Sequence, residues 1–328
     1  MMKKKLFLGV DVGSVSTNLA VLDEASNIVE SVYLRTQGRP IETVQRGLSE
    51  MGKLLGDRAE DIAGVGATGS ARQLTAVLVG ADSVKNEITA HAVAASLVIP
   101  DVRTVLEIGG QDSKIIILRN GIVVDFAMNT VCAAGTGSFL DQQAGRLSIP
   151  IEEFGDYALR GMSAVRIAGR CTVFAESDMI HKQQMGHTTE DIIAGLADAL
   201  VRNYLNNIAR GKKIQSPVVF QGGVAANKGI RKAFEQELGL EIIVPEHYGV
   251  MGAIGAAQLA MEQVAISGKT RFKGFQAAEF SYRTQGFECN LCPNVCEIVE
   301  IIQDGEVISR WGDKCERFQD LSVQPPEK

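Results

Sequence analysis

Three glycine-rich turns constrain the fold of this chain more than any other feature. Each follows a run of aliphatic or β-branched residues, as the turn after a strand does, and they occur at residues 9–17 (GVDVGSVST), 107–112 (EIGGQD) and 220–224 (FQGGV). Glycine has no Cβ, so backbone N–H groups in such turns can approach a phosphate closely. We therefore expect an α/β fold in which two turns face each other across a cleft and grip a nucleotide triphosphate, while the third lines the base and ribose.

The order strand, glycine turn, strand, turn, strand occurs twice, at residues 5–33 and 104–128. An internal repeat of this kind predicts two similarly folded lobes around one cleft, and a length of 328 residues is ample for two. We assign residues 1–97 to the first lobe, together with a returning helix at 250–264, and residues 98–249 to the second. Residues 267–328 change in character and form a small C-terminal, cysteine-rich module.

Polar residues at the turns suggest roles in binding ATP or ADP with Mg²⁺. Asp11 opens the first turn and is the candidate for holding Mg²⁺, most simply through water. Gln111 and Asp112 lie in the second turn, where a group that orients the attacking water is needed. No Walker lysine motif is present, which excludes a P-loop. The plain alternative is that all three segments are ordinary tight turns, but their matching contexts favour a nucleotide site. The other candidate nucleotide-binding residues are Gly13, Ser14, Ser16, Thr17, Glu107, Gly109, Gly110, Gly222, Gly223 and Val224.

Composition excludes several classes of function. The net charge is −6 and aromatic residues make up 5% of the chain, which argues against nucleic acid as a partner. No stretch has the length of a transmembrane helix, and the early apolar run ends too soon for a signal peptide. We expect a cytoplasmic protein with no membrane partner. Four scattered histidines, to which we assign structural or surface roles, are His91, His181, His187 and His247.

The arrangement of the turns resembles that of the superfamily of actin, sugar kinases and heat-shock chaperones. The resemblance covers about residues 5–262 and implies two duplicated, ribonuclease H-like lobes that close on ATP. Because this fold carries both kinases and ATP-dependent switches, the resemblance alone does not choose between them.

Two cysteines in the middle of the chain are candidates for metal ligation. Cys132 precedes an amphipathic helix, and Cys171 lies in the segment GRCTVFAES. Unpaired N–H groups at a helix N-terminus acidify a thiol and would stabilise a negatively charged iron–sulfur cluster. Two thiolates are too few for a cuboidal cluster, but a twofold-symmetric dimer would supply four. The alternative is that both are buried core cysteines, the commoner fate of a free cysteine.

Longer motifs favour the cluster. The segments LEIGGQDSK (106–114), CAAGTG (132–137), CTVFAES (171–177) and QGGV (221–224) closely resemble the activators of 2-hydroxyacyl-CoA dehydratases and the related benzoyl-CoA reductase ATPase subunits. The resemblance implies one [4Fe-4S] cluster shared by a homodimer through Cys132 and Cys171. It also implies that ATP hydrolysis drives one low-potential electron, received from a ferredoxin or flavodoxin, into a partner iron–sulfur protein. The matched phosphate loops contain Asp11, Gly13, Ser14, Gly109, Gly110 and Gln111, and the matched adenosine loop contains Gly222, Gly223 and Val224.

The tail carries four more cysteines: Cys289, Cys292, Cys296 and Cys315. A Cys-x2-Cys pair with two further cysteines nearby is typical of a metal site, with zinc slightly favoured and a second iron–sulfur cluster close behind. The alternative is a set of unliganded thiols. The partner stays open too, between a dehydratase that acts on an acyl-CoA and a double-cubane cluster protein.

Two rival functions remain at this stage. A small-molecule kinase of the same superfamily would leave the cluster cysteines without a role, and so would a non-catalytic switch that binds a protein client. Both rivals would be colourless when purified without oxygen, whereas a cluster-bearing activator would be brown.

Overall fold

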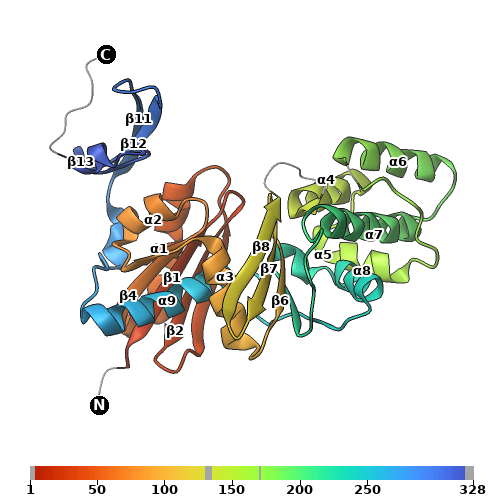
Figure 1. The fold of residues 1–328 in the computed structure, drawn as a ribbon, viewed down its shortest axis with the longest axis horizontal. Coiled ribbons are helices and arrows are strands. Elements are labelled where there is room, and N and C mark those ends of the chain that lie inside the picture. Colours follow the sequence, from red (N-terminus) through yellow and green to blue (C-terminus); the bar gives the residue numbers. More distant parts are fainter. Residues whose placement is uncertain (1–3, 130–134, 170, 322–328) are drawn as a thin grey trace.

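The computed structural model describes residues 4–129, 135–169 and 171–321. Two large lobes lie side by side, and a small sheet near the C-terminus projects from the first lobe (Figure 1). Cys132 lies in the gap at 130–134 and is therefore outside the described residues. None of the helices in these ranges is both long and apolar enough to cross a bilayer.

The first lobe is built on a five-stranded sheet in the order β3-β2-β1-β4-β5. The first three strands form an antiparallel meander, and β4 and β5 then add in parallel to β1. β1 is buried along nearly its whole length because helices cover both faces of the sheet. The elements are β1 (Leu6–Val12), β2 (Ser16–Asp23), β3 (Ile28–Arg35), α1 (Pro40–Leu55), β4 (Ile62–Thr68), α2 (Arg72–Val79), β5 (Ser83–Val84) and α3 (Glu87–Val98).

The second lobe repeats this plan. Its sheet has the order β10-β9-β6-β7-β8, with an antiparallel meander of β6, β7 and β8 and parallel additions of β9 and β10. The duplicated, two-lobed fold expected from the sequence is therefore confirmed. The elements are β6 (Thr104–Ile108), β7 (Ser113–Arg119), β8 (Ile122–Asn129), α4 (Gly137–Leu147), α5 (Ile151–Arg160), α6 (Thr172–Gln184), α7 (Thr189–Asn207), β9 (Val218–Gln221), α8 (Lys228–Leu238) and β10 (Ile242–Ile243).

Two helices, α3 and α9 (Met251–Ser267), join the lobes through a shared apolar core. This core combines side chains of β1 and β2 with side chains of β6, β7 and β9, and α3 and α9 contribute to it from between. The helices approach closely because they are rich in alanine and glycine. A Cβ built on Gly255 of α9 would lie 1.9 Å from the carbonyl oxygen of Ala90 in α3. The chain passes between the lobes twice, at residues 99–103 and again at 244–250.

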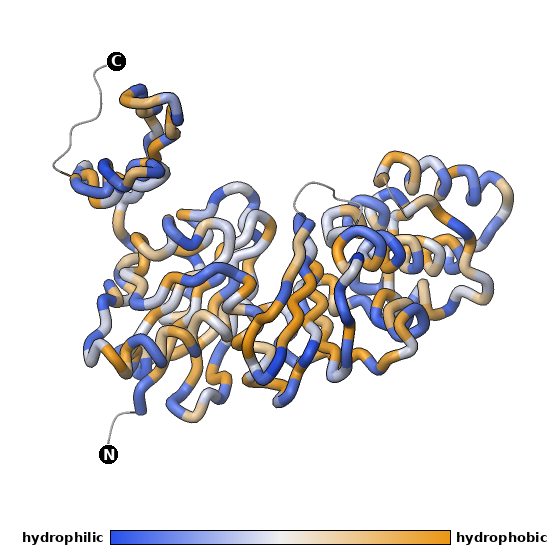
Figure 2. Tube along the Cα trace, viewed as in Figure 1, coloured by the Kyte–Doolittle hydropathy of each residue, from blue (hydrophilic) through white to orange (hydrophobic). Residues whose placement is uncertain are grey.

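Each lobe also has its own core. In the first lobe, aliphatic side chains of the sheet pack against α1 and α2. In the second, the sheet packs against the helical layer of α4 to α8. Figure 2 shows apolar residues concentrated along the strands of the second sheet. The glycine turns lie at the ends of strands in both lobes, so the two cores position them on opposite sides of one cleft.

The C-terminal residues form a three-stranded antiparallel sheet of β11 (Tyr282–Cys289), β12 (Cys296–Gln303) and β13 (Glu306–Trp311). The segment before this sheet belongs structurally to the first lobe. Ala277 is buried in the first-lobe core, and the Gln45 side chain of α1 donates hydrogen bonds to the carbonyl oxygens of Ala278 (3.1 Å) and Phe280 (2.7 Å). The chain at 272–280 is therefore a strap across α1, and the sheet beyond it projects but keeps contact with the first-lobe core through Ile301 of β12.

Candidate nucleotide site

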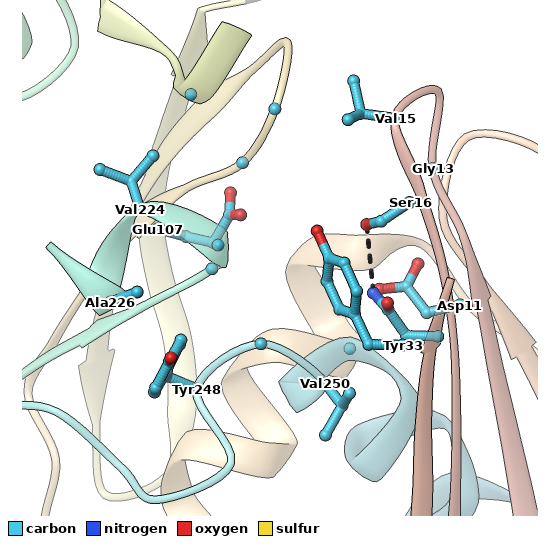
Figure 3. Close-up of a pocket in the computed structure, with 18 of the residues that line it drawn as sticks. Asp11, Gly13, Val15, Ser16, Tyr33, Glu107, Val224, Ala226, Tyr248 and Val250 are labelled. Atoms are coloured by element: carbon cyan, nitrogen blue, oxygen red, sulfur yellow. Dashed lines mark hydrogen bonds between the residues drawn. The ribbon is translucent and has the colours of Figure 1, made fainter. Parts of the chain in front are cut away.

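A cleft of about 540 Å³ lies between the two lobes (Figure 3). Its volume is typical of a site for a small ligand or cofactor. All three glycine turns contribute to its wall, as does the first turn of α9. The structure thus brings together these candidate residues: Asp11, Gly13, Ser14, Ser16, Glu107, Gly109, Gly110, Gln111, Asp112, Gly222, Gly223 and Val224.

Thr17 is the candidate that does not line the cleft. It is fully buried, and its hydroxyl lies 3.0 Å from the hydroxyl of Thr36. Thr36 in turn donates to the carbonyl oxygen of Gly13 at 3.0 Å. Because Thr17 is the second residue of β2, the alternation of the strand directs it into the core while Ser16 faces the cleft. Thr17 therefore supports the first turn from behind.

The two phosphate turns approach each other across the cleft. The first turn is closed by a bond from Gly13 N to the carbonyl oxygen of Ser16 (2.8 Å), and the second by a bond from Gly109 N to that of Asp112 (2.9 Å). A Cβ built on Gly110 would lie 2.6 Å from the Val15 side chain. Glycine at 110 is therefore what allows the turns to come this close.

A buried ammonium group links the charged side chains of the cleft. Lys114 is 1% exposed, and its Nζ lies 2.8 Å from Asp112 Oδ1, 3.0 Å from Glu107 Oε2 and 3.3 Å from Glu87 Oε2. Its three N–H groups thus face three carboxylates. Glu107 and Lys114 are directly opposite each other in the antiparallel pair β6–β7, so the sheet register itself brings this pair together.

Burial strongly affects the carboxylates at the base of the cleft. It raises the pKa of Asp11 to about 7, with the negative charge of Glu87 adding to the rise. Burial also raises the pKa of Glu107 to about 7, although Lys114 opposes this shift. For Lys114, burial alone would lower the pKa, but the surrounding carboxylates outweigh it and keep the group charged. The site therefore combines a permanent cation with carboxylates that titrate near neutral pH.

Two residues of this cluster, Lys114 and Glu87, were missed from the sequence. His91, to which we assigned a structural or surface role, also lines the cleft. A lysine inside the otherwise apolar strand SKIIILR was a usable signal, because an unpaired charge is almost never buried. Pairing Lys114 with Glu107, across the glycine turn that separates the two predicted strands, would have identified the ion pair. No comparable pattern distinguished His91, which lies in an alanine-rich helix.

The far end of the cleft has an aromatic wall. Tyr33 of β3 extends from the first lobe, and its hydroxyl would lie 3.7 Å from a Cβ built on Gly223 (Figure 3). Tyr248 lies on the opposite side, and its carbonyl oxygen accepts a bond from Gly222 N at 2.9 Å. The predicted adenosine loop is therefore enclosed by groups from both lobes. His247, another histidine to which we gave a structural or surface role, also lines this end.

Within the described ranges, no three Asp, Glu, His or Cys side chains come together closely enough to hold a metal ion. The carboxylates of Asp11, Glu107 and Asp112 face one cleft, but Lys114 occupies the space among the second-lobe acids. A magnesium ion characteristically keeps several waters and binds through one or two carboxylates and the substrate phosphates. The cleft suits that mode of binding better than an all-protein cage.

Of the two candidate cluster cysteines, Cys171 lies within the described residues. Cys171 is the N-cap residue of α6, as expected for a thiol at a helix N-terminus, and it is partly exposed. Val173 and Phe174 in the first turn of α6 are each 65% exposed, so an apolar surface adjoins the thiol. Cys132 lies outside the described residues.

The tail cysteines lie around one end of the small sheet. Cys289 and Cys296 are directly opposite each other in the β11–β12 pair, Cys292 is exposed in the turn between them, and Cys315 is exposed beyond β13. All four are described, and no three of them meet at metal-binding distance. The four-thiolate metal site therefore stays a prediction that requires the tip of the sheet to rearrange.

The duplicated lobes, the three glycine turns and the shared cleft define an actin-like ATPase. The model of the BadF/BadG/BcrA/BcrD ATPase family matches residues 8–260, and the chain belongs to this family. The match ends before the strap and the small C-terminal sheet, so these are additions to the family's common part.

Several relatives carry more specific names. The chain is 35% identical over 263 residues to the 2-hydroxyisocaproyl-CoA dehydratase activator of Clostridioides difficile, covering 80% of this chain and 97% of that protein. It is 36% identical over 258 residues to the (R)-2-hydroxyglutaryl-CoA dehydratase activating ATPase of Acidaminococcus fermentans, covering 79% and 98%.

The chain is also similar to solved structures of such proteins. The crystal structure of component A of the Acidaminococcus fermentans (R)-2-hydroxyglutaryl-CoA dehydratase matches with a TM-score of 0.75 and 36% identity, over 80% of this chain and 99% of that one. The Clostridium difficile activator, solved with bound ADPNP, matches with a TM-score of 0.74 and 34% identity, over 81% and 97%. Both structures support the actin-like ATPase fold of this chain.

Proposed function

We propose that this chain is an ATP-dependent electron-transfer activator. Two copies would share one [4Fe-4S] cluster through Cys132 and Cys171, and ATP turnover would drive one low-potential electron from that cluster to a partner iron–sulfur protein. The names of the relatives support a partner of the 2-hydroxyacyl-CoA dehydratase type. The electron would come from a ferredoxin or flavodoxin, and ATP and water would become ADP and phosphate in a separate step.

The observation that carries the proposal is a set of hydrogen bonds between the second phosphate turn and the residues that follow Cys132. The carbonyl oxygens of Gly109 and Gly110 accept bonds from the backbone N–H groups of Gly137 (2.9 Å) and Ser138 (2.8 Å), at the start of α4. On the strand after the turn, the hydroxyl of Ser113 donates to the carbonyl oxygen of Gly135 at 2.6 Å. A shift of the turn on phosphate binding would therefore move the segment that carries Cys132.

Helix α7 makes a second connection of the same kind. The Asn203 side chain donates to the carbonyl oxygen of Gly169, two residues before Cys171. The next residue, Tyr204, donates from its hydroxyl to the carbonyl oxygen of Lys114 at 2.5 Å, next to the charged cluster of the cleft. Both residues are buried. One rigid helix thus contacts both the Cys171 segment and the nucleotide site, which supports coupling between them.

The surroundings of Cys171 fit an iron–sulfur ligand. The backbone N–H groups in the first turn of α6 have no intrahelical partners and favour negative charge, so they would stabilise a thiolate and the anionic cluster bound to it. When bound, the cluster supplies a one-electron redox centre whose potential depends on such donors. Exposed Val173 and Phe174 would lie beside it and limit access of water.

Residues of the cleft would handle the nucleotide. Backbone N–H groups of both glycine turns would bind phosphate oxygens, and Asp11 would orient the waters around Mg²⁺. Gln111 would position the attacking water at the second turn, with Asp112 beside it. Gly222, Gly223 and Val224 would line the adenosine. A ligand shifts a conformational equilibrium only through a difference in its affinity for the two states. ATP and ADP differ by one phosphate, which would give them different preferences for the open and closed arrangements of the cleft.

Single-turnover electron transfer tests the proposal. Protein purified without oxygen and reduced would be mixed with its iron–sulfur partner in the presence of ATP, of ADP or of no nucleotide. We expect transfer with ATP and much slower transfer in the other two. Equal rates in all three would leave an ordinary redox protein on an ATPase fold, and a colourless protein that phosphorylates a small molecule would be a kinase.

We further propose that Cys289, Cys292, Cys296 and Cys315 bind a separate metal ion, with zinc favoured over a second iron–sulfur cluster. The facing pair Cys289 and Cys296 and the exposed positions of the other two thiols support this, because a short movement of the turn would gather them. Metal analysis of a variant with all four changed to serine is the test. Loss of one zinc equivalent with four irons per dimer retained is expected, and an unchanged metal content would rule the site out.

A further inference from the structure

Helix α3 places two polar side chains, one helical turn apart, against the second lobe. Glu87 is the first residue of the helix and His91 follows four positions later, so both lie on one face. Glu87 contacts Lys114 of β7, and His91 contacts Gln221 of β9. We call these the inter-lobe contacts, because α3 follows the first sheet in the chain and both partners are strand residues of the second.

The Glu87–Lys114 contact adds a first-lobe carboxylate to a second-lobe cluster. The Lys114 side chain is 2% exposed, and two of its three carboxylate partners, Glu107 and Asp112, are in its own lobe. Only Glu87 reaches it from α3. Separation of the lobes at this point would leave one N–H group of a buried ammonium without its acceptor, which is unfavourable.

The His91–Gln221 contact is neutral and wholly buried. Burial lowers the pKa of His91 to about 4, so the ring is uncharged at neutral pH. The side-chain nitrogen of Gln221 can only donate, and it lies 2.8 Å from His91 Nδ1, which therefore accepts. The side-chain oxygen of Gln221 has no hydrogen-bond partner among the described residues. His91 is thus the group that holds this amide in place.

The inter-lobe contacts lie at one end of the interface that α3 makes with the second lobe. One other ion pair, Arg35–Asp141 (3.3 Å), joins the lobes, but its side chains are 51% and 39% exposed, so water can replace it at little cost. On the same helix, Ile88, Ala92 and Ala95 are buried against the shared core of both lobes. Apolar surfaces can slide and rotate on each other at little cost, whereas hydrogen bonds and ion pairs depend steeply on distance and angle. Opening of the cleft would therefore break the inter-lobe contacts first, with the apolar part acting as the hinge.

We propose that Glu87 and His91 are positioning residues for nucleotide turnover, which hold the cleft in its closed arrangement through Lys114 and Gln221. They set the fraction of molecules that can bind ATP productively. The apparent dissociation constant for ATP equals the intrinsic constant divided by that fraction, so it rises when the fraction falls. This inference rests on the ATPase activity alone and does not depend on the cluster or the electron-accepting partner.

Steady-state ATPase measurements on Glu87→Ala, His91→Phe and the double variant test the inference. Each single change is expected to raise the KM for ATP about 3- to 10-fold and to leave kcat within about twofold. The double variant is expected to raise KM further. Glu87→Gln keeps an oxygen that accepts a hydrogen bond from Lys114 and should recover part of the loss. Glu50→Ala, a charge change on the exposed face of α1, is the matched control and should leave KM unchanged.

Hydrogen exchange supplies a readout that does not rely on activity. In the nucleotide-free variants, backbone amides at the start of α3 and the end of β9 should exchange faster than in the native protein, and ADPNP should restore their protection. A fall in kcat with KM unchanged would overturn the inference in favour of a direct catalytic role. Lower thermal stability with unchanged KM and unchanged exchange at these sites would reduce both residues to general packing.

Discussion

At the scale of single residues, the nucleotide cleft carries more negative charge than its buried ammonium can balance. Asp11, Glu87, Glu107 and Asp112 face one lysine, Lys114. A triphosphate would add further negative charge to this site, so a divalent cation has to enter with it. The nucleotide-free cleft is correspondingly strained by its own carboxylates, and this strain has a measurable dependence on pH.

Asp11→Asn should stabilise the nucleotide-free protein at alkaline pH. The folded state raises the pKa of Asp11 from 3.8 to about 7, so the folded state binds more protons than the unfolded state between these values. The contribution of Asp11 to stability therefore falls as pH rises through this window. A neutral amide removes that loss. We expect a melting temperature roughly 2–4 °C above the native one at pH 8, a smaller difference at pH 5 and a difference near zero only below about pH 3.8.

The control for this prediction is Asp23→Asn at the last residue of β2. Asp23 accepts bonds from the backbone N–H groups of Ala25 and Asn27, and hydrogen bonds from Asn27 lower its pKa. Its ionised form is favoured by folding, so its replacement should lower stability at pH 8. The Asp11 prediction fails if Asp11→Asn changes the melting temperature equally at both pH values.

Gln111→Ala and Cys132→Ala should separate the two proposed sites. Gln111 lines the cleft at the second phosphate turn, so its removal is expected to slow ATP hydrolysis about 10- to 100-fold and leave the cluster assembled. Cys132→Ala is expected to abolish the cluster and retain nucleotide binding. Iron content, ATPase rate and single-turnover electron transfer are the measurements. Electron transfer should fail in both variants, and its survival in either would show that the two sites are not coupled.

Residue-level prediction from the sequence succeeded where a backbone conformation was required. Gly110 had to be glycine to admit Val15, and the glycine turns were therefore readable as turns. It failed for His91 and Lys114, whose roles depend on partners more than a hundred residues away or across a sheet register. Thr17 illustrates the same limit, because the side of the strand on which a residue lies decides whether it reaches the ligand.

At the scale of elements, the meanders and the returning helix could be predicted because their period and turn residues are local. The order of strands and turns predicted over residues 104–128 agrees with β6, β7 and β8, and the helix predicted at 250–264 agrees with α9. The three-stranded sheet of the tail could not be predicted in the same way. Much of β11 is exposed, and cysteines interrupt the alternation of apolar and polar residues along the strands. The burial of α3 and α9 between two sheets depends on how the lobes pack, which no local pattern records.

Gly255→Ala should destabilise the protein through the contact of α9 with α3. Its Cβ would lie 1.9 Å from the carbonyl oxygen of Ala90, a backbone atom that can move only if the whole helix moves. We expect a loss of about 1–3 kcal/mol in the free energy of unfolding. Urea denaturation measures it.

Gly145→Ala is the matched control for this prediction. Gly145 also lies within a helix, α4, and a Cβ at this position would meet no atom within 4 Å. Alanine is the better helix former, so this change should stabilise the protein by roughly 0.5–1 kcal/mol. If both variants lost stability to the same extent, close packing of α9 would not be the cause.

At the scale of the whole molecule, the tail is not an independent module, because its first residues pack on the core of the first lobe. The strap at 272–280 completes the first-lobe core, with Phe275 against Gly52 and Ala277 buried. A chain that ends at Val264 should therefore lose about 2–4 kcal/mol of stability, whereas one that ends at Ser281 should lose less. Thermal unfolding of both chains, with ATPase activity retained in the longer one, checks this. Equal stability of the two would mean that the strap contributes nothing.

The two passages of the chain between the lobes have a mechanical consequence. A single tether would let one lobe swivel in any direction about the other, but tethers at residues 99–103 and 244–250 define a line between them. Two bodies joined along a line keep one easy degree of freedom, a rotation about that axis. Under the proposed function, the energy of nucleotide turnover would then be directed into one motion instead of being dispersed over many. Such an arrangement would deliver the same displacement at every cycle, whichever partner receives it.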